Sequence, residues 1–401
     1  MSVIKIHTKI QLSISQIFCA ICLLAQFARS SAWFKTTGVL DTCMTMVQIV
    51  CMVWFGMKRM VEKRFSYLDG GIMIFYLTLL ISTLTVSKDV FSWATYAIQG
   101  IGSVFLIEEM LEENEKGGMR LIRNTAFLFL LGNLATMVAF PNGMGASGYD
   151  LLGSRIGFTP YAVIGAAAAL ICEMLEEDRK FSLYAALVIA AAVLNLVKKQ
   201  VSTGLIALSV MALLLLLKWM LGKWGKTILN YWLFLGIAAL LFMAVVLMGS
   251  STFLQSLLSI FQEDTTFGGR TIIWETALSY IEQRPVWGYG VTATGAFWIF
   301  DYVQNRMLPA HNEILNILYQ GGIVSLCAFL ALFVLVGRAV RKCGGRNIEE
   351  TATICIFAFA CVMITEIQTQ KAIIFLMLAM LYQLGRNRWR TSDEKSTVAG
   401  K

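Results

Sequence analysis

The chain has 401 residues, of which 57% are hydrophobic and only 14% charged, and its mean hydropathy is +0.69. A soluble globular protein carries about 25% charged residues, so this composition excludes a fully water-exposed surface and indicates a protein that crosses a membrane many times. The net charge of +8 does not point to nucleic acid, because the basic residues form short clusters between apolar runs, as membrane topology requires. The nine cysteines lie mostly inside those runs and imply no disulfide framework.

Twelve apolar runs follow one another along the chain. Each is about as long as the roughly 20 residues that a helix needs to cross the hydrocarbon core. They predict an all-α fold, a polytopic membrane helical bundle of about 12 transmembrane helices. The runs lie near 11–28, 39–57, 70–87, 90–107, 121–140, 156–175, 181–197, 200–217, 230–249, 312–336, 350–367 and 371–385.

The distribution of positive charge predicts the orientation. With the N-terminus in the cytoplasm, 23 of the 33 basic residues fall on the cytoplasmic side, as the positive-inside rule demands. Both termini are then cytoplasmic, and the long loop 250–311, between spans nine and ten, is external. We expect a single transmembrane domain over 1–385 and a disordered, polar cytoplasmic tail over 386–401.

Two stretches near the ends of spans allow more than one interpretation. The first apolar run, with Lys5 and Lys9 before it, has features of a cleaved signal peptide, but we favour a retained first span. The acidic run 108–115 is expected to be a solvated cytoplasmic loop. Lys198 and Lys199 lie on the external side in a very short turn, where they either anchor helix ends at the interface or form an anion site.

The external loop contains the first candidate site residues. A helical pattern starts near Arg270, after Gly268-Gly269, and must end by Pro285, so a short helix is expected over about 270–284. A guanidinium can hold a diphosphate through two or more hydrogen bonds, although Arg270 can also be a cation on a wet helix face. Trp274 suits an interfacial aromatic belt or a surface that packs against sugars.

His311 follows Pro309 and should lie at a helix N-terminus, where the macrodipole keeps the imidazole neutral near pH 7. A neutral imidazole beside free helix N–H groups suits proton abstraction or phosphate contact, although a histidine there is more often a cap or an interfacial residue. Asn312, Asn316 and Gln320 recur every four residues and predict a polar stripe that faces the bundle interior. No D-x-D, H-E-x-x-H, P-loop or G-x-S-x-G motif occurs, so we expect a reaction without metal or cofactor.

The order of these features resembles the O-antigen polymerase and O-antigen ligase family. The motifs that carry the resemblance are Gly269-Arg270, Trp274, Pro285-Val-Trp-Gly288-Tyr-Gly290, His311-Asn312 and Gly321-Gly322. Arg155-Ile-Gly157 is similar to an R-x-x-G segment of the family, but Thr159-Pro160-Tyr161 replaces its asparagine-rich continuation. The segment 201–204 lacks the arginine found in the family, and Lys198 or Lys199 would supply that charge.

The resemblance implies a glycosyltransferase of the bacterial cytoplasmic membrane whose donor is a polyprenyl-diphosphate-linked glycan and whose acceptor is a glycan. An acceptor hydroxyl attacks the anomeric carbon, the lipid diphosphate leaves, and the configuration inverts. Arg270 and a second cation would hold the diphosphate, and His311 would be the base or a second diphosphate contact. Arg155, Lys198, Lys199, Asn312, Asn316 and Trp274 are the candidate substrate-binding residues.

We favour polymerisation of repeat units into O-antigen, capsule or exopolysaccharide. The alternative within the family is a ligase that transfers finished glycan to a lipid or wall acceptor. An alternative of another class is a lipid-glycan flippase or transporter, since such proteins commonly have about twelve spans. Besides donor, acceptor and membrane lipid, a chain-length regulator or a flippase is a candidate partner, and nucleic acid is not.

Overall fold

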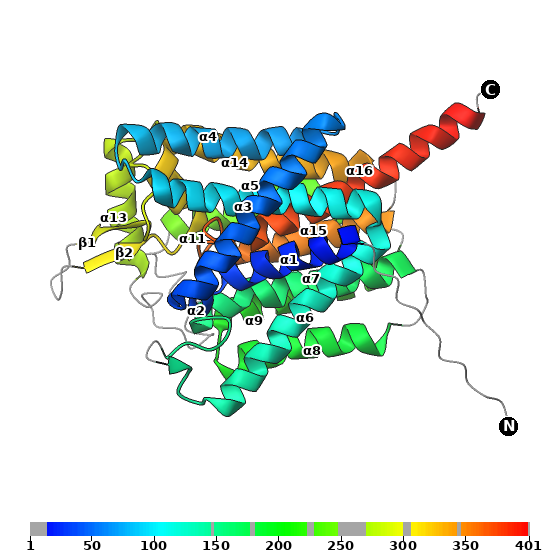
Figure 1. The fold of residues 1–401 in the computed structure, drawn as a ribbon, viewed down its shortest axis with the longest axis horizontal. Helices are drawn as coiled ribbons and strands as arrows, with labels where there is room; N and C mark the ends of the chain where they lie inside the picture. The colour runs from blue at the N-terminus through cyan, green and yellow to red at the C-terminus, as the bar shows by residue number, and fades with distance from the viewer. Residues whose placement is uncertain are drawn as a thin grey trace.

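The computed structural model describes residues 14–145, 148–176, 181–222, 228–247, 270–299, 306–342 and 346–399. Helices occupy all twelve predicted spans, and most of them run roughly parallel, with α3 and α6 tilted across the others (Figure 1). They are α1 (Ile14–Ser30), α3 (Gly38–Val61), α4 (Tyr67–Thr85), α5 (Val90–Glu113), α6 (Glu115–Ala139), α7 (Phe158–Glu176), α8 (Leu183–Lys198), α9 (Ser202–Leu221), α11 (Tyr231–Leu247), α14 (Glu313–Lys342), α15 (Arg346–Met363) and α16 (Ile373–Ala399).

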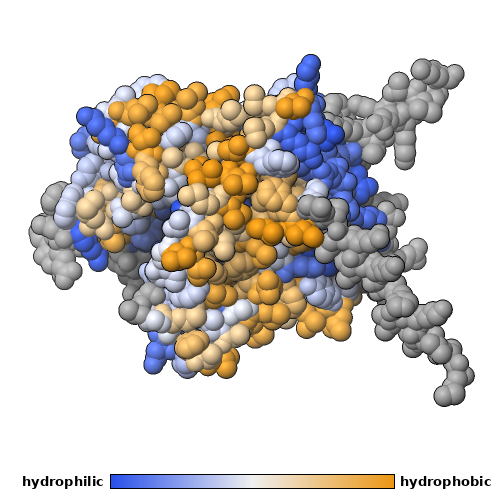
Figure 2. Space-filling view, in the orientation of Figure 1, coloured by the Kyte–Doolittle hydropathy of each residue, from blue (hydrophilic) through white to orange (hydrophobic). Residues whose placement is uncertain are grey.

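Length and hydropathy confirm a helical membrane protein. Seven of these helices, α3, α4, α5, α6, α7, α9 and α14, are each long and apolar enough to cross a membrane, while α1, α8 and α11 are apolar but shorter. The first turns of α15 carry Glu349 and Glu350, and the second half of α16 is polar, which lowers their hydropathy. Apolar side chains cover the middle of the face in Figure 2, and hydrophilic ones gather toward both ends.

Short elements cover one end of the bundle. These are α2 (Ala32–Thr36), the 3₁₀ turn η2 (Arg155–Gly157), α13 (Arg270–Gln283), β1 (Ala296–Ile299) and β2 (Arg306–Pro309). We call this the hairpin end, and we call the opposite end, where α1 begins and the last turns of α16 lie, the tail end (Figure 1). The Gly268-Gly269 turn and the rest of 248–269 lie outside the described residues.

The antiparallel pair β1–β2 is the one sheet among the described residues, and the sequence did not predict it. Its register places Ala296 opposite Pro309 and Ile299 opposite Arg306. Phe297 and Ile299 turn inward and join a small apolar cluster with Ile273 and Ala277 of α13. The pair therefore packs against an apolar face of α13. A strand of only four residues is too short for its sequence pattern to predict this packing.

The helix α14 is interrupted at Gly322, whose backbone adopts φ +62° and ψ −166°. Residues 285–290 fill the interruption, because the Tyr289 N–H donates to the Tyr319 carbonyl at 2.8 Å and the Gly290 N–H donates to the Gln320 carbonyl at 2.7 Å. The break therefore leaves carbonyl groups that the preceding loop can satisfy, as buried backbone requires.

Two glycines make this close approach possible. A Cβ atom on Gly322 would lie 2.1 Å from the Val286 carbonyl oxygen, and one on Gly288, which has φ +65°, would lie 2.5 Å from the Tyr319 carbonyl oxygen. Only glycine tolerates such backbone conformations and contacts at little cost. The P-x-x-G-x-G and Gly-Gly motifs are therefore two halves of one backbone junction.

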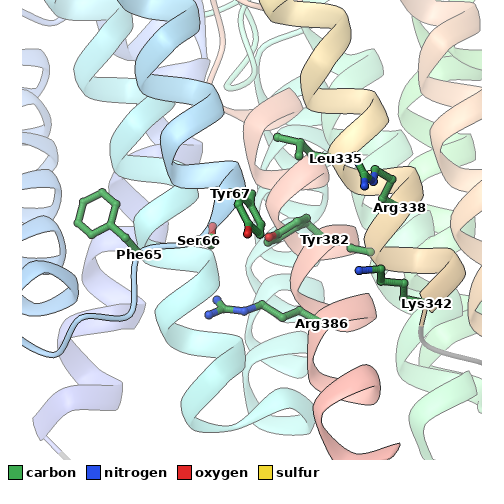
Figure 3. A pocket seen from close by; sticks show the side chains of 9 residues that line it. Phe65, Ser66, Tyr67, Leu335, Arg338, Lys342, Tyr382 and Arg386 are labelled. Carbon is green, nitrogen blue, oxygen red and sulfur yellow. The ribbon is translucent and has the colours of Figure 1, made fainter. Parts of the chain in front are cut away.

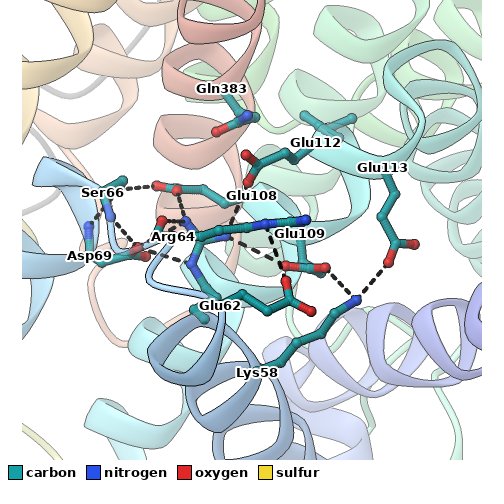
Figure 4. A network of polar contacts seen from close by, with 12 residues as sticks. Lys58, Glu62, Arg64, Ser66, Asp69, Glu108, Glu109, Glu112, Glu113 and Gln383 are labelled. Carbon is teal, nitrogen blue, oxygen red and sulfur yellow. Dashed lines mark hydrogen bonds and ion pairs between the residues drawn. The ribbon is translucent and has the colours of Figure 1, made fainter.

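The acidic run at the tail end is helical and partly buried, which corrects the expectation of a solvated loop. Glu108 and Glu109 lie in α5, and both side chains are buried. An Arg59 guanidinium nitrogen lies 2.6 Å from the Glu108 carboxylate, and Arg59 Nε donates to Asp69 at 3.0 Å. Lys58 Nζ lies 2.6 Å from Glu109 (Figure 4). These carboxylates can be buried because Lys58 and Arg59 of α3 form ion pairs with them.

The start of the polar tail lies in α16, which runs to Ala399. No proline or glycine interrupts residues 386–399. Arg386 lies 3.5 Å from the Glu108 carboxylate, and Asn387 and Arg388 contact Glu115 of α6 at 3.0 and 3.2 Å. Composition alone predicts disorder here, because it does not reveal these carboxylates on other helices.

Candidate functional site

Trp274 fixes α13 against the residues that precede α14. Its side chain is buried, and its indole Nε1–H donates a hydrogen bond to the Ala310 carbonyl at 3.1 Å. Arg270 is one helical turn before Trp274 and so lies on the same face of α13. The bond therefore brings the first turn of α13 next to the segment that carries His311.

Arg270 and His311, both half-buried, lie close enough to interact electrostatically. Burial lowers the pKa of His311 from its usual 6.5, and the Arg270 guanidinium lowers it further. His311 has φ +49°, a left-handed conformation that is uncommon for a residue with a side chain. Burial and the neighbouring guanidinium therefore both favour the neutral form of this imidazole.

Asn312 is the N-cap of α14. Its Oδ1 accepts a hydrogen bond from the Leu315 N–H at 3.0 Å, and its Nδ2 donates to the Ile364 carbonyl at 2.8 Å. The side chain is fully buried. Because both ends of its amide bond to the protein, Asn312 sets where α14 begins and so where His311 lies.

The next residue, Glu313, joins α14 to the connection between α15 and α16. Its buried carboxylate accepts hydrogen bonds from the backbone N–H groups of Gln368 and Thr369 and from the Thr369 hydroxyl. The connection 364–372 is thereby held beside the start of α14. Asn312 and Glu313 thus both hydrogen-bond the start of α14 to the connection between α15 and α16.

That connection supplies Glu366, which the sequence analysis did not identify. Glu366 is buried and accepts hydrogen bonds from the Thr159 hydroxyl and from Gln368 Nε2, both at 3.1 Å. Burial raises its pKa, while Lys371 and, more weakly, Arg270 oppose the rise. A carboxylate within the predicted apolar run 350–367 was the available signal, because an ionisable residue in a span is often functional.

Lys371 is the second cation near the site. Burial lowers its pKa, and the Glu366 and Glu313 carboxylates oppose that shift. Its charge therefore interacts with Glu366, which in turn interacts with Arg270. We name Arg270, His311, Glu366 and Lys371 the outer cluster.

The polar stripe of α14 faces inward as predicted, since Asn312, Asn316 and Gln320 are all buried. The Asn316 amide and Gln320 Nε2 have no hydrogen-bond partner among the described residues. A Cβ atom on Gly295 would lie within 3.4 Å of the Asn316 and Gln320 side chains, so the stripe ends under the hairpin segment. These amides can donate and accept hydrogen bonds to a hydroxyl-rich ligand.

The other three candidate cations, Arg155, Lys198 and Lys199, do not contact Arg270 or His311 in the part of the chain that the structure describes. Lys199 Nζ lies 2.7 Å from the carboxylate of Asp150, which is itself buried, so its charge is paired within the protein. Lys198 and Arg155 are exposed at the hairpin end.

The segments around those cations nevertheless approach the outer cluster. Thr159, in the first turn of α7, bonds Glu366, and Thr203, in the first turn of α9, accepts a hydrogen bond from Thr365 at 3.3 Å. The N-termini of α7, α9 and α14 therefore surround the 364–369 connection. Their dipoles direct partial positive charge toward this region.

An apolar groove of about 530 Å³ lies between α11, α14 and α15. Its lining includes Gly236 and Phe242 of α11 and Phe329 of α14, and it reaches Ile314 and Ile364. Ile364 is the residue whose carbonyl binds Asn312. The groove therefore ends beside the outer cluster and passes along the bundle away from it.

Comparison with known proteins supports the resemblance drawn from the motifs. Residues 185–330 match the family model described as O-antigen ligase. The match begins in α8 and ends in α14, so it includes Arg270 and His311 but not Glu366 or Lys371. No curated protein matches the chain. The matched segment is therefore similar to the O-antigen ligase family, and it is the part of the chain that contains α13 and the start of α14.

Proposed function

We propose that this protein is a glycosyltransferase that polymerises polyprenyl-diphosphate-linked oligosaccharide repeat units into a surface polysaccharide. The observation that carries the proposal is that the Trp274–Ala310 hydrogen bond holds the helix that begins at Arg270 beside His311, at one end of a membrane bundle. An acid–base group and a diphosphate-binding cation in one place suit transfer from a lipid diphosphate.

The proposed reaction needs no step beyond an inverting displacement. The acceptor hydroxyl oxygen forms a bond to the anomeric carbon, while the bond from that carbon to the diphosphate oxygen breaks and its electron pair leaves with the diphosphate. His311 accepts the hydroxyl proton. Arg270 and Lys371 stabilise the charge that develops on the leaving diphosphate, so the reaction proceeds without a metal ion.

The apolar groove supports the proposed donor. Its apolar lining between α11, α14 and α15 suits an isoprenoid chain, and its end at Ile314 and Ile364 would place an attached diphosphate near Arg270. The buried amides of Asn316 and Gln320 are then available to sugar hydroxyls. Trp274 and Asn312 would act by positioning Arg270 and His311 rather than by touching substrate.

The proposal places the hairpin end on the outer face of the cytoplasmic membrane and both termini in the cytoplasm. Cysteines introduced at Glu275 on α13 and at Glu62 between α3 and α4 lie at opposite ends of the bundle and are both exposed. In a background without reactive thiols, an impermeant reagent added to intact cells should label Glu275→Cys alone. Labelling of Glu62→Cys alone would reverse the orientation.

A ligase is the second candidate, because the matched family model is itself described as O-antigen ligase. The two activities differ in what accumulates when the protein is absent. Without a polymerase, a deletion strain should contain single lipid-linked repeats. Without a ligase, it should contain long chains still attached to the polyprenyl carrier. Size-resolved analysis of lipid-linked glycans decides between them, and a ladder of long lipid-linked chains would contradict polymerisation.

A further inference from the structure

A second pocket lies at the tail end, remote from the outer cluster. It has a volume of about 820 Å³ and opens between α4, α14 and α16. Its polar lining comprises Ser66, Arg338, Lys342, Tyr382 and Arg386, with no aspartate or glutamate. Figure 3 shows Arg338 and Lys342 on α14 opposite the face of α16 that carries Tyr382 and Arg386.

The cations of this pocket are not simply the basic residues that membrane topology places at a cytoplasmic end. Arg341, on the same turn of α14, lies outside the pocket and 3.8 Å from Glu349. Arg386 is half-buried and held at 3.5 Å by Glu108, a carboxylate already shared with Arg59. Topology needs cations near this end, but it does not require three of them to line one cavity.

Ser66, the N-cap of α4, already makes its hydrogen bonds within the protein. Its hydroxyl accepts from the Leu68 and Asp69 N–H groups and donates to the Glu108 carboxylate at 2.8 Å. Because Asp69 and Glu108 offset the dipole at this helix end, the charge that attracts an anion comes from the basic side chains. Tyr382, which is buried, adds a phenolic hydroxyl to the lining.

The rest of the lining is apolar and continues into the lipid-facing surface. Phe65, Leu335, Ala339 and the ring of Tyr67 make up this part of the lining, and Ile74 of α4 and Val334 of α14 are exposed on the same two helices. A cationic floor with an apolar rim fits an amphiphile whose anionic group enters the pocket while its chains remain in the membrane. Basic pockets between transmembrane helices on the cytoplasmic side bind anionic headgroups in this way.

We propose that the pocket formed by Ser66, Arg338, Lys342, Tyr382 and Arg386 binds a phosphate group carried by an anionic lipid of the cytoplasmic leaflet. The shared chemistry is a phosphate oxyanion, which a soluble phosphate compound also offers. The apolar rim makes the lipid the favoured source. The site is separate from the proposed transferase site, and only its assignment to the cytoplasmic leaflet rests on the orientation proposed above.

Binding can be measured on the full chain, purified and delipidated in detergent. The probes are short-chain phosphatidylglycerol, short-chain phosphatidylcholine and inorganic diphosphate. Phosphatidylglycerol should bind most tightly and raise the melting temperature. Tight binding of diphosphate without a preference for phosphatidylglycerol would keep the phosphate site and assign it to a soluble ligand. If none of the three probes binds, the proposal is wrong.

Variants test whether binding occurs in this pocket. The double change Arg338→Gln/Lys342→Gln should weaken phosphatidylglycerol binding on the order of 30-fold, because each cation contributes about a factor of five. Arg341→Gln is the matched control and should bind like wild type. An equal loss in both would show nonspecific attraction and would overturn the proposal.

A cavity-filling variant covers the case in which the double variant does not fold. Leu335→Trp keeps every charge but occupies space inside the pocket, so it should reduce phosphatidylglycerol binding at least 10-fold. Elution as a single species in detergent confirms that it is folded. Unchanged binding in a folded Leu335→Trp protein would place the lipid elsewhere and contradict the proposal.

Discussion

The indole nitrogen of Trp274 lies 3.1 Å from the carbonyl oxygen of Ala310, the residue immediately before His311. Through this bond, a helix that begins at Arg270 is fastened to the start of α14. Arg270 therefore lies close enough to His311, 41 positions later in the sequence, for its guanidinium to lower the pKa of the imidazole. This geometry leads to predictions for the cation, the base and the groups that position them.

The first prediction concerns the two residues proposed to act on substrate. Arg270→Ala and His311→Ala should each lower the rate of polymer formation about 5- to 150-fold, because each removes about 1–3 kcal/mol of transition-state stabilisation. Arg270→Lys should also be poor, since one ammonium does not reproduce the guanidinium fork. The measurement is polymer formed from lipid-linked repeats at matched membrane protein levels.

Glu275→Gln is the control for these changes, because Glu275 is exposed on α13 and lies on another face of the helix from Arg270. It should leave the rate unchanged. Normal polymer formation by the Arg270→Ala protein would remove Arg270 from the site. The same result for His311→Ala would remove the proposed base.

The second prediction separates positioning from chemistry. Trp274→Phe retains an aromatic ring in the apolar cluster but loses the hydrogen bond to Ala310, which is worth about 1 kcal/mol. The rate should fall about 5-fold, and the acid pKa of its pH profile should move toward 6.5 as Arg270 loosens from His311. Trp298→Phe, at an exposed position of β1, should change neither quantity. A lower rate with an unchanged acid pKa would indicate a structural role alone.

The third prediction concerns the backbone junction. Gly322→Ala places a Cβ atom against the Val286 carbonyl at a residue with positive φ, so we expect a destabilisation on the order of 3 kcal/mol or more. Gly70→Ala is the control, because a Cβ atom there meets nothing within 4 Å. Melting in detergent measures both. A Gly322→Ala protein with wild-type melting would show that residues 285–290 do not need the break.

Much of this architecture could be predicted from the sequence, because hydrophobic periodicity and length identify membrane helices well. The helix at Arg270–Gln283 was readable for a related reason, since Pro285 must end it. The hairpin β1–β2 could not be predicted from the sequence, because its strands pack on the apolar face of α13. The ion pair between Arg386 and Glu108 was not predictable for the same reason, because the two residues lie on different helices.

The site was only partly predictable. His311 and Arg270 could be singled out because motifs mark them. Glu366 could not be joined to them, because nothing local shows that Thr159 and Glu366, 207 residues apart, share a hydrogen bond. The sequence also did not show that Asn312, a candidate substrate-binding residue, caps α14 and donates to the Ile364 carbonyl. Local pattern identifies which residues are unusual, and tertiary packing decides what each one touches.

The last prediction is the pH dependence of the reaction. As a base, His311 must be unprotonated, so activity falls as the pH drops through its pKa in the folded protein. Because burial and Arg270 both lower that pKa, wild-type activity should persist below pH 6.5 before it declines. Arg270→Gln removes the second cause but leaves burial, so its residual activity should decline at a higher pH than that of wild type. Arg270→Lys keeps the charge and should decline near the wild-type pH. The measurement is the pH profile of kcat/KM, and an Arg270→Gln profile that stays in place or shifts to lower pH would show that Arg270 does not act on this histidine.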